Sequence, residues 1–137
     1  MTGKAFLDTN IILAYLLKDN PERSQKSFQL LGQAERNEIQ LYATELVIAD
    51  VVWILQGTRY RMPRSMIRDL LLPVIELPGI RLANKGLYQE IFSLYVDSKI
   101  DFIDAHNAVV MQRLGLKDIY SYDKDFNRVP GVNRLEP

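Results

Sequence analysis

The sequence predicts an α/β sandwich in which a mostly parallel central sheet is flanked by helices. Short apolar segments alternate along the chain with longer segments of helical pattern, and the chain begins with a strand followed directly by a helix. The 137 residues contain no internal repeat, low-complexity tract or linker, and a chain of this length supports one hydrophobic core. We therefore expect one domain over residues 1–137.

The first half of the chain contains two helix starts with strong local signals. Asn20 precedes a proline and Thr44 precedes a glutamate, and both residue types cap helices by accepting a backbone hydrogen bond. Phe28, Leu30 and Leu31 are expected on the inner face of the helix after Asn20. The expected elements are a buried strand at 5–7, helices at 11–17 and 21–36, a strand at 39–42 and a helix at 45–56.

The helix at 45–56 is apolar nearly all round, with Asp50 as the exception in its middle. A helix without a polar face belongs in the interior of a domain, so we expect this one to be central and buried. Gly57 ends it, and Gly115 takes the left-handed stop position after the last helix. The expected elements beyond it are helices at 63–76, 84–97 and 101–114 and strands at 80–82 and 119–121.

The composition restricts the available chemistry. Seventeen basic and seventeen acidic side chains cancel, so no net positive field draws in a polyanion. The absence of cysteine and the single histidine, His106, exclude thiolate chemistry and histidine-rich zinc sites. Oxygen ligands remain, and they suit Mg²⁺ or Mn²⁺. The first ten residues turn polar too early for a secretory signal and no apolar run is long enough to span a membrane, so we expect a cytoplasmic protein.

Four aspartates stand among apolar neighbours that are expected to be buried. They are Asp8 in Phe-Leu-Asp, Asp50 in Ile-Ala-Asp-Val-Val, Asp104 in Phe-Ile-Asp-Ala and Asp123 in Tyr-Ser-Tyr-Asp. An ionised carboxylate removed from water needs a partner, and basic residues are scarce beside these four. Because ligand sites form outside the carboxyl ends of parallel strands, we expect the four to converge there. A divalent cation would offset their repulsion and support phosphodiester hydrolysis.

Each acid also has a purely structural interpretation. Asp8 could cap the helix that follows it, and Asp101 with Asp104 could form an N-cap and N3 pair. Asp123 could be an ordinary turn residue, as could the aspartate two residues later. Asp50 has no capping role, so a structural interpretation there requires a buried partner. No single acid is strong evidence, but the four together favour a metal site.

The order of four short motifs resembles a known family. The motifs are FLDTNI at 6–11, ELVIADVVWIL at 45–55, DFIDA at 101–105 and SYDKDF at 121–126. In this order, over almost the whole chain, they resemble PIN domains, named for the PilT N-terminus, and especially the VapC-type toxins of prokaryotic toxin–antitoxin pairs. The resemblance implies a three-layer sandwich and an endoribonuclease that forms homodimers and is held inactive by a small antitoxin protein bound over the cleft.

The resemblance also implies a set of site residues. The Mg²⁺ or Mn²⁺ ligands would be Asp8, Asp50, Asp104 and Asp123. Asn10 and Ser121 would orient these ligands, and Asp101 and Asp125 would be outer acids. Two positions depart from the family. Asp50 stands where the family usually has glutamate, so its metal contact would be direct after a small shift, water-mediated or weak. Ser121 stands where threonine is common, and both residues offer a hydroxyl.

A basic stretch with an aromatic residue is the first candidate for contact with the RNA substrate. Its positive charges could meet phosphates, and its tyrosine could stack on a base or ribose. The alternative is a solvated connection between helices, where arginine is common. The candidate RNA-binding residues are Arg59, Tyr60, Arg61 and Arg64, with Lys124 beside the acidic motif near the end.

Three other functions compete with a toxin nuclease. A phosphatase of the haloacid-dehalogenase type also begins with a strand ending in aspartate, but its motif requires a second aspartate where this chain has Asn10. A catalytically silent PIN-like module, weakened by Asp50, would act through protein binding alone. A nuclease of RNA maturation would use the same site as a toxin, and the sequence does not separate the two.

Overall fold

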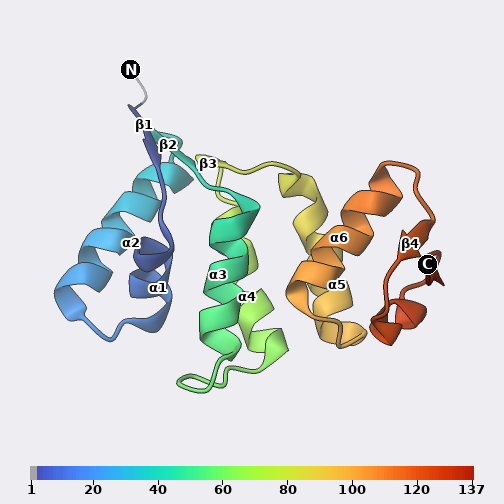
Figure 1. The fold of residues 1–137 in the computed structure, drawn as a ribbon. Coiled ribbons are helices and arrows are strands. Elements are labelled where there is room, and N and C mark those ends of the chain that lie inside the picture. Colours follow the sequence, from blue (N-terminus) through green and yellow to red (C-terminus); the bar gives the residue numbers. More distant parts are fainter. Residues whose placement is uncertain (1–2) are drawn as a thin grey trace. The chain divides into compact units, whose positions relative to one another are not determined.

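The structure, a computed structural model, describes residues 3–137 (Figure 1). These residues form two compact units, unit 1 up to Lys85 and unit 2 from Gly86 to Pro137. Both units combine helices with parallel strands, so the predicted α/β class is confirmed. Over residues 3–137 no helix has the length and hydropathy needed to cross a membrane.

Unit 1 is built on a three-stranded parallel sheet in the order β1-β2-β3. The strands are β1 (Gly3–Phe6), β2 (Ile39–Tyr42) and β3 (Ile80–Arg81). The helices α1 (Thr9–Leu17) and α2 (Pro21–Glu35) connect β1 to β2, and α3 (Glu45–Gln56) and α4 (Arg64–Ile75) connect β2 to β3. Parallel neighbours require such crossovers, because each strand must restart at the same end of the sheet.

The two predicted helix starts are confirmed. Asn20 Oδ1 accepts a hydrogen bond from the backbone N of Arg23 at 3.1 Å, and Thr44 Oγ1 accepts one from the backbone N of Val47 at 3.4 Å. Pro21 follows Asn20 at the first helical position, where the missing N–H costs nothing. Each cap contributes about 1 kcal/mol to its helix and fixes where α2 and α3 begin.

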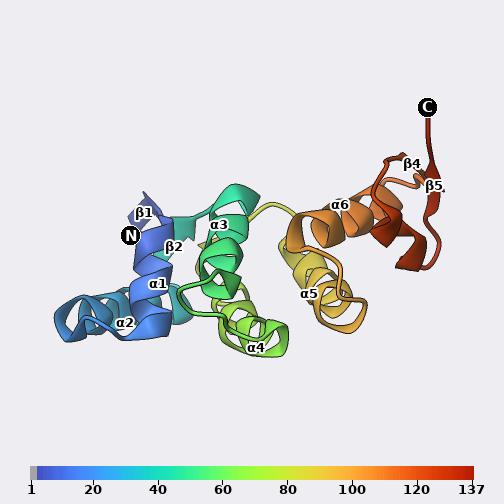
Figure 2. The same ribbon diagram turned by 60° about the horizontal axis from the view of Figure 1, so that its bottom comes forward.

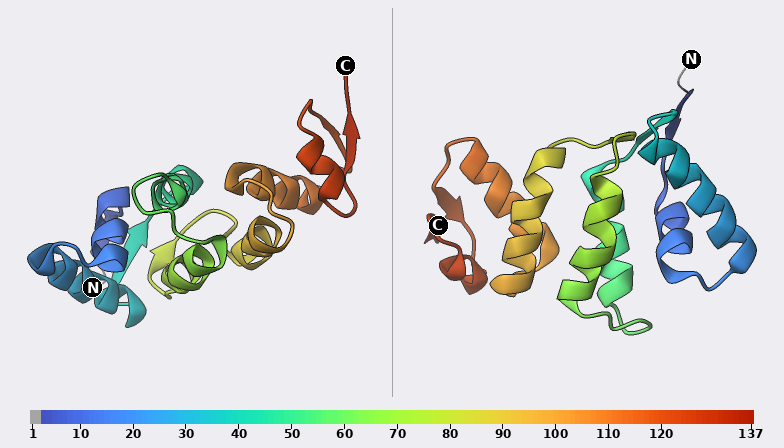
Figure 3. Two further views of the ribbon diagram at one scale, coloured as in Figure 1. Left: turned by 90° about the horizontal axis from the view of Figure 1, so that it is seen from below. Right: turned by 180° about the vertical axis from the view of Figure 1, so that it is seen from behind.

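The core of unit 1 is formed mainly by α3 and α4, which pack against each other (Figure 3). Burial of aliphatic side chains of this size stabilises the fold by about 1.5–3 kcal/mol for each residue. The buried residues of α3 are Val47, Ile48, Val51, Val52 and Leu55, and those of α4 are Ile67, Leu71, Val74 and Ile75.

Gly79 lets the end of α2 approach the chain just before β3. Its backbone N donates to the Ala34 carbonyl oxygen at 2.8 Å, and its carbonyl oxygen accepts from the Leu41 backbone N at 2.8 Å. A Cβ atom at this position would lie 2.7 Å from the Ala34 carbonyl oxygen. Only glycine therefore fits here without a shift of the backbone.

Several residues expected in the core are exposed instead. On α3, Leu46 is 75% and Trp53 72% exposed, so the helix is not buried all round as predicted. It packs on α1 and α4, and these cover only part of its apolar circumference. In the predicted buried strand, Phe6 is 60% exposed, and only Leu7, which follows β1, is buried. Phe28, predicted on the inner face of α2, is 59% exposed.

Unit 2 is a helix pair followed by a small sheet (Figure 2). Aromatic rings pack between the helices, with the Phe102 ring centroid 5.3 Å from that of Phe92 and 5.9 Å from that of Tyr95. The elements are the 3-10 helix η1 (Lys85–Leu87), the helices α5 (Tyr88–Asp97) and α6 (Phe102–Arg113), β4 (Asp118–Tyr120), the 3-10 helix η2 (Lys124–Arg128) and β5 (Asn133–Leu135). The sequence predicted all of them except η1, η2 and β5, and β5 pairs parallel to β4.

Candidate active site

The acidic residues of unit 2 lie close together at the start of α6. Asp101 is the N-cap of α6 and Asp104 lies in its first turn, half-buried. The pKa of Asp104 is raised, first by burial, then by the negative charge of Asp123 and of Asp101, and further by a hydrogen bond with Asp123 and by the charge of Asp125. Four carboxyl groups from two separate segments therefore influence one another.

Short hydrogen bonds shape the loop that carries Asp123. Ser121 Oγ accepts from the backbone N of Asp123 at 3.0 Å, and Asp123 Oδ1 accepts from the backbone N of Asp125 at 2.9 Å. Asp123 thus caps η2, as its structural interpretation expects. The same carboxylate acts on Asp104 in α6. Asp123 therefore both caps η2 and belongs to the acidic cluster around Asp104.

Arg128 fastens this loop to the end of α5. Its guanidinium donates to the carbonyl oxygens of Ser98 at 3.2 Å and Lys99 at 3.1 Å, and to Asp125 Oδ1 at 3.0 Å. Arg134 holds the other side of the loop by donating to the Ser121 carbonyl oxygen at 3.0 Å. The acidic segment is consequently tied to its own unit at both ends.

In unit 1, Asp8 stands between β1 and α1. It occupies the N-cap position of α1, but its side chain makes no capping hydrogen bond and is exposed. The capping interpretation therefore does not account for the Asp8 carboxylate. Asn10, two residues later in the first turn of α1, is also exposed.

Asp50 is exposed on α3, which corrects the expectation that it is buried among apolar residues. Its neighbours one turn away on the helix are Leu46 and Trp53, the two exposed apolar residues of α3. Because Asp8 and Asp50 are both exposed, their carboxylates do not need a buried partner. Asp104 is the one member of the predicted quartet for which the desolvation argument holds.

The donor chemistry of these residues fits a hard divalent cation, since all of them offer oxygen atoms. The crowding around Asp104 is the kind of repulsion that such a cation relieves. Among residues 3–137, however, no group of three or more His, Cys, Asp or Glu side chains is arranged so that it could hold a metal ion. The acidic cluster of unit 2 therefore does not form a complete metal site by itself.

The predicted RNA-binding residues lie on two surfaces. The Arg59 guanidinium lies 5.1 Å from the centroid of the Tyr60 ring in the connection between α3 and α4. Arg61 follows with a positive φ of 46°, and Arg64 is the first residue of α4. Lys124 is exposed at the start of η2, directly after Asp123.

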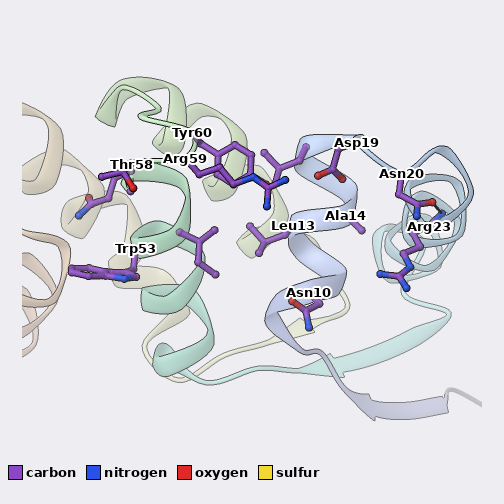
Figure 4. Close-up of a pocket in the computed structure, with 14 residues that line it drawn as sticks. Asn10, Leu13, Ala14, Asp19, Asn20, Arg23, Trp53, Thr58, Arg59 and Tyr60 are labelled. Carbon is purple, nitrogen blue, oxygen red and sulfur yellow. Dashed lines mark hydrogen bonds between the residues drawn. The ribbon is translucent and has the colours of Figure 1, made fainter.

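A cleft along α1 is a feature that the sequence analysis missed (Figure 4). It has a volume of about 770 Å³ and lies within unit 1. One stripe of α1 forms its floor. The loop after α1 with the start of α2, and the end of α3 with the connection to α4, form its walls. The signal was present, since the floor residues Asn10, Leu13, Ala14 and Leu17 have the spacing of one helix face. We call this feature the α1 cleft.

Comparison with known proteins gives one result that covers nearly the whole chain. No curated protein is similar enough to this chain to match it with significance. The family model of the PIN domain matches residues 5–132, a range that includes all four predicted metal ligands and most of each unit. The chain therefore belongs to the PIN domain family, whose members as a class are metal-dependent nucleases.

Proposed function

We propose that this protein is a metal-dependent endoribonuclease, and that it is the toxin of a toxin–antitoxin pair. Family membership supplies the coarse activity, hydrolysis of nucleic-acid phosphodiester bonds. The observation that supports it best in the structure is the Asp104 carboxyl, crowded by Asp123 and its acidic neighbours and raised in pKa. The carboxylates of such a cluster repel one another, and a divalent cation beside them would offset this repulsion.

Each site residue has a separate proposed role. The metal ligands are Asp8, Asp50, Asp104 and Asp123, with Asn10 and Ser121 orienting them and Asp101 and Asp125 as outer acids. The ion is Mg²⁺ or Mn²⁺, and when bound it supplies charge neutralisation and a more acidic water for hydrolysis to a 3′-hydroxyl and a 5′-phosphate. Ser121 Oγ accepts a hydrogen bond from the backbone N of Asp123, and the Asp123 carboxylate is itself directed by the hydrogen bond that it accepts from the backbone N of Asp125. We also propose that residues 1–137 are a single nuclease domain.

Substrate and partners follow the same proposal. The substrate is RNA in the cytoplasm, held by Arg59, Tyr60, Arg61, Arg64 and Lys124. The partners are a small antitoxin protein and a second copy of the chain. Exposed apolar side chains on α3, Leu46 and Trp53, support a protein partner, because large apolar residues at such exposure are suited to an interface.

A second candidate is a silent PIN-like module that acts through protein binding. Asp50 favours it, because aspartate is one methylene shorter than the usual glutamate and this side chain is exposed. A nuclease of RNA maturation remains the third. A short upstream gene that encodes a DNA-binding antitoxin would favour the toxin over the maturation enzyme.

Cleavage of labelled single-stranded RNA by the pure protein tests the proposal. Mn²⁺ or Mg²⁺ should support cleavage and EDTA should abolish it. Asp8→Asn and Asp104→Asn should each lose activity by about a hundredfold or more, since removal of a metal ligand costs at least what loss of a supporting residue costs. Asp97→Asn, an exposed aspartate at the end of α5, is the matched control. Absence of cleavage with every metal, in protein shown to be free of antitoxin, would reject the nuclease.

A further inference from the structure

The α1 cleft joins an apolar floor to two positive side chains. Arg23 and Arg59 are exposed at its walls, and no described residue forms an ion pair with either of them. The single acid among the lining residues is Asp19. The half-buried apolar lining residues are Leu13, Ala14, Leu17 and Ile54. This combination suits a ligand with a flat, weakly polar body and a negative charge.

The guanidinium of Arg59 packs against the ring of its neighbour Tyr60. It lies over the Tyr60 ring at 5.1 Å from the centroid, a cation–π contact that restricts its rotamers. Figure 4 shows Arg59 and Tyr60 extending from the α3–α4 connection towards α1, whereas Trp53 lies on the side of α3 turned away from α1. A guanidinium whose rotamers are restricted in this way loses less entropy when it binds a phosphate or stacks on a nucleobase.

Polar groups mark the two ends of the cleft. Asn10 lies at the end nearer Asp8, in the first turn of α1, and Asp19 lies beyond the C-terminal end of the same helix. An amide offers both a donor and an acceptor, and a carboxylate offers acceptors, which are the groups that read the edges of bases. The volume of about 770 Å³ is within the usual range of roughly 300–1,000 Å³ for ligand pockets.

We propose that the α1 cleft is a subsite that binds one nucleotide of the RNA substrate, with Arg23 and Arg59 on phosphates and the base over the floor of α1. This inference rests on the proposed function for its substrate class. An apolar helix of a partner protein would also cover the floor. Two arginines against one aspartate favour the anionic ligand, because an apolar helix would leave both guanidinium groups without a partner.

RNA binding without catalysis tests the subsite. Fluorescence anisotropy of a short fluorescein-labelled single-stranded RNA in EDTA measures affinity while hydrolysis is prevented. Arg59→Gln and Arg23→Gln should each weaken binding about tenfold, the value of one charge-assisted contact. Each should also reduce the slope of log K against log salt by about 0.7. Arg36→Gln is the control, because Arg36 lies at the other end of α2, about 20 Å from Arg23 along the helix axis.

Amide NMR spectra locate the bound nucleotide. Addition of AMP, GMP, CMP or UMP should shift signals of residues 10–17 and 57–60, and Arg59→Gln should remove the shifts. Equal loss of RNA affinity in Arg36→Gln would overturn the proposal, because it would indicate a general charge effect. Shifts with an amphipathic helical peptide but with no nucleotide would also overturn it and make the cleft a protein-docking groove.

The two proposals fail in different ways. Nucleotide binding at the cleft without RNA cleavage in any metal would refute the nuclease and leave the subsite. Metal-dependent cleavage with an unchanged KM in Arg23→Gln and Arg59→Gln would refute the subsite and leave the nuclease.

Discussion

In unit 1 Asp8 and Asp50 are exposed, whereas in unit 2 Asp104 is half-buried and surrounded by other carboxyl groups. Both side chains of the first pair are open to water. The second group is held together despite its repulsion, because Ser121 Oγ accepts a hydrogen bond from the backbone N of Asp123 and Arg128 donates one to Asp125. An acidic residue beside apolar sequence neighbours can therefore lie in either environment. The crowding around Asp104 is the electrostatic cost expected of a metal ligand.

The largest expected effect is stabilisation by metal. Mn²⁺ at a hundred times its Kd should raise the free energy of unfolding by about 2.7 kcal/mol, because only the folded state binds it. Asp104→Asn and Asp123→Asn should lose this gain, and so should Asp8→Asn and Asp50→Asn if both units supply ligands. Thermal unfolding with and without Mn²⁺ measures it. Loss in the unit 2 variants alone would remove Asp8 and Asp50 from the ligand set.

Gly79→Ala should destabilise unit 1 by about 2 kcal/mol, because the new methyl group would overlap the Ala34 carbonyl oxygen. Gly86→Ala is the matched control, since a Cβ there meets no atom within 4 Å. Urea unfolding followed by far-UV circular dichroism gives both values. One shifted transition would mean that the two units unfold together, and a shift of only one of two transitions would mean that they unfold separately. An unchanged midpoint would contradict the close approach at Gly79.

Arg128→Gln should cost about 1–2 kcal/mol, because its guanidinium bonds two carbonyl oxygens and Asp125 and is partly exposed. It should also weaken Mn²⁺ binding, since the acidic loop would lose its attachment to α5. Isothermal titration with Mn²⁺ and urea unfolding separate the two effects. Arg113→Gln, an exposed arginine at the end of α6, should change neither. Normal Mn²⁺ affinity in Arg128→Gln would show that the loop keeps its position without this contact.

The smallest expected effect concerns pH. Because the folded-state pKa of Asp104 is raised, by burial first and then by the Asp123 charge, its protonated form favours the fold. This contribution is complete below the unfolded-state pKa and is lost as the pH rises through the folded-state pKa. At neutral pH in EDTA, Asp104→Asn should thus be more stable than the wild type, by less than about 1 kcal/mol because the group is partly exposed. An Asp104→Asn variant that is less stable than the wild type under these conditions would contradict the repulsion between Asp104 and its acidic neighbours.

Local signals in the sequence sufficed for most of the elements. Asn20 and Thr44 fix the starts of α2 and α3 through backbone bonds within the next turn, so no distant residue is needed to recognise them. β5 escaped detection because it has three residues, Asn-Arg-Leu, and gains its structure only by pairing with β4. Short strands with mixed polarity have no periodicity of their own.

Burial and mutual position were harder to predict. The apolar sequence around Asp50 indicated an interior helix. The exposure of its residues, however, depends on how many sides of α3 are covered by other elements, and the sequence of α3 alone does not determine this. Asp104 and Asp123 are brought together by a loop whose attachment depends on Arg128, about thirty positions from the carbonyl groups that it binds. The role of the four acids as metal ligands stays a prediction, and whether each acid is exposed or half-buried could not be predicted from the sequence.

The exposure of Trp53 gives the protein an intrinsic optical reporter. It is the only tryptophan in the sequence, and it stands one helical turn from Asp50 with 72% of its surface open to solvent. Indole emission shifts to shorter wavelength when water around the ring is replaced by another molecule. Binding of any molecule to this face of α3 should therefore shift the Trp53 emission to shorter wavelength. The shift can be measured without a label and without a change in the covalent structure.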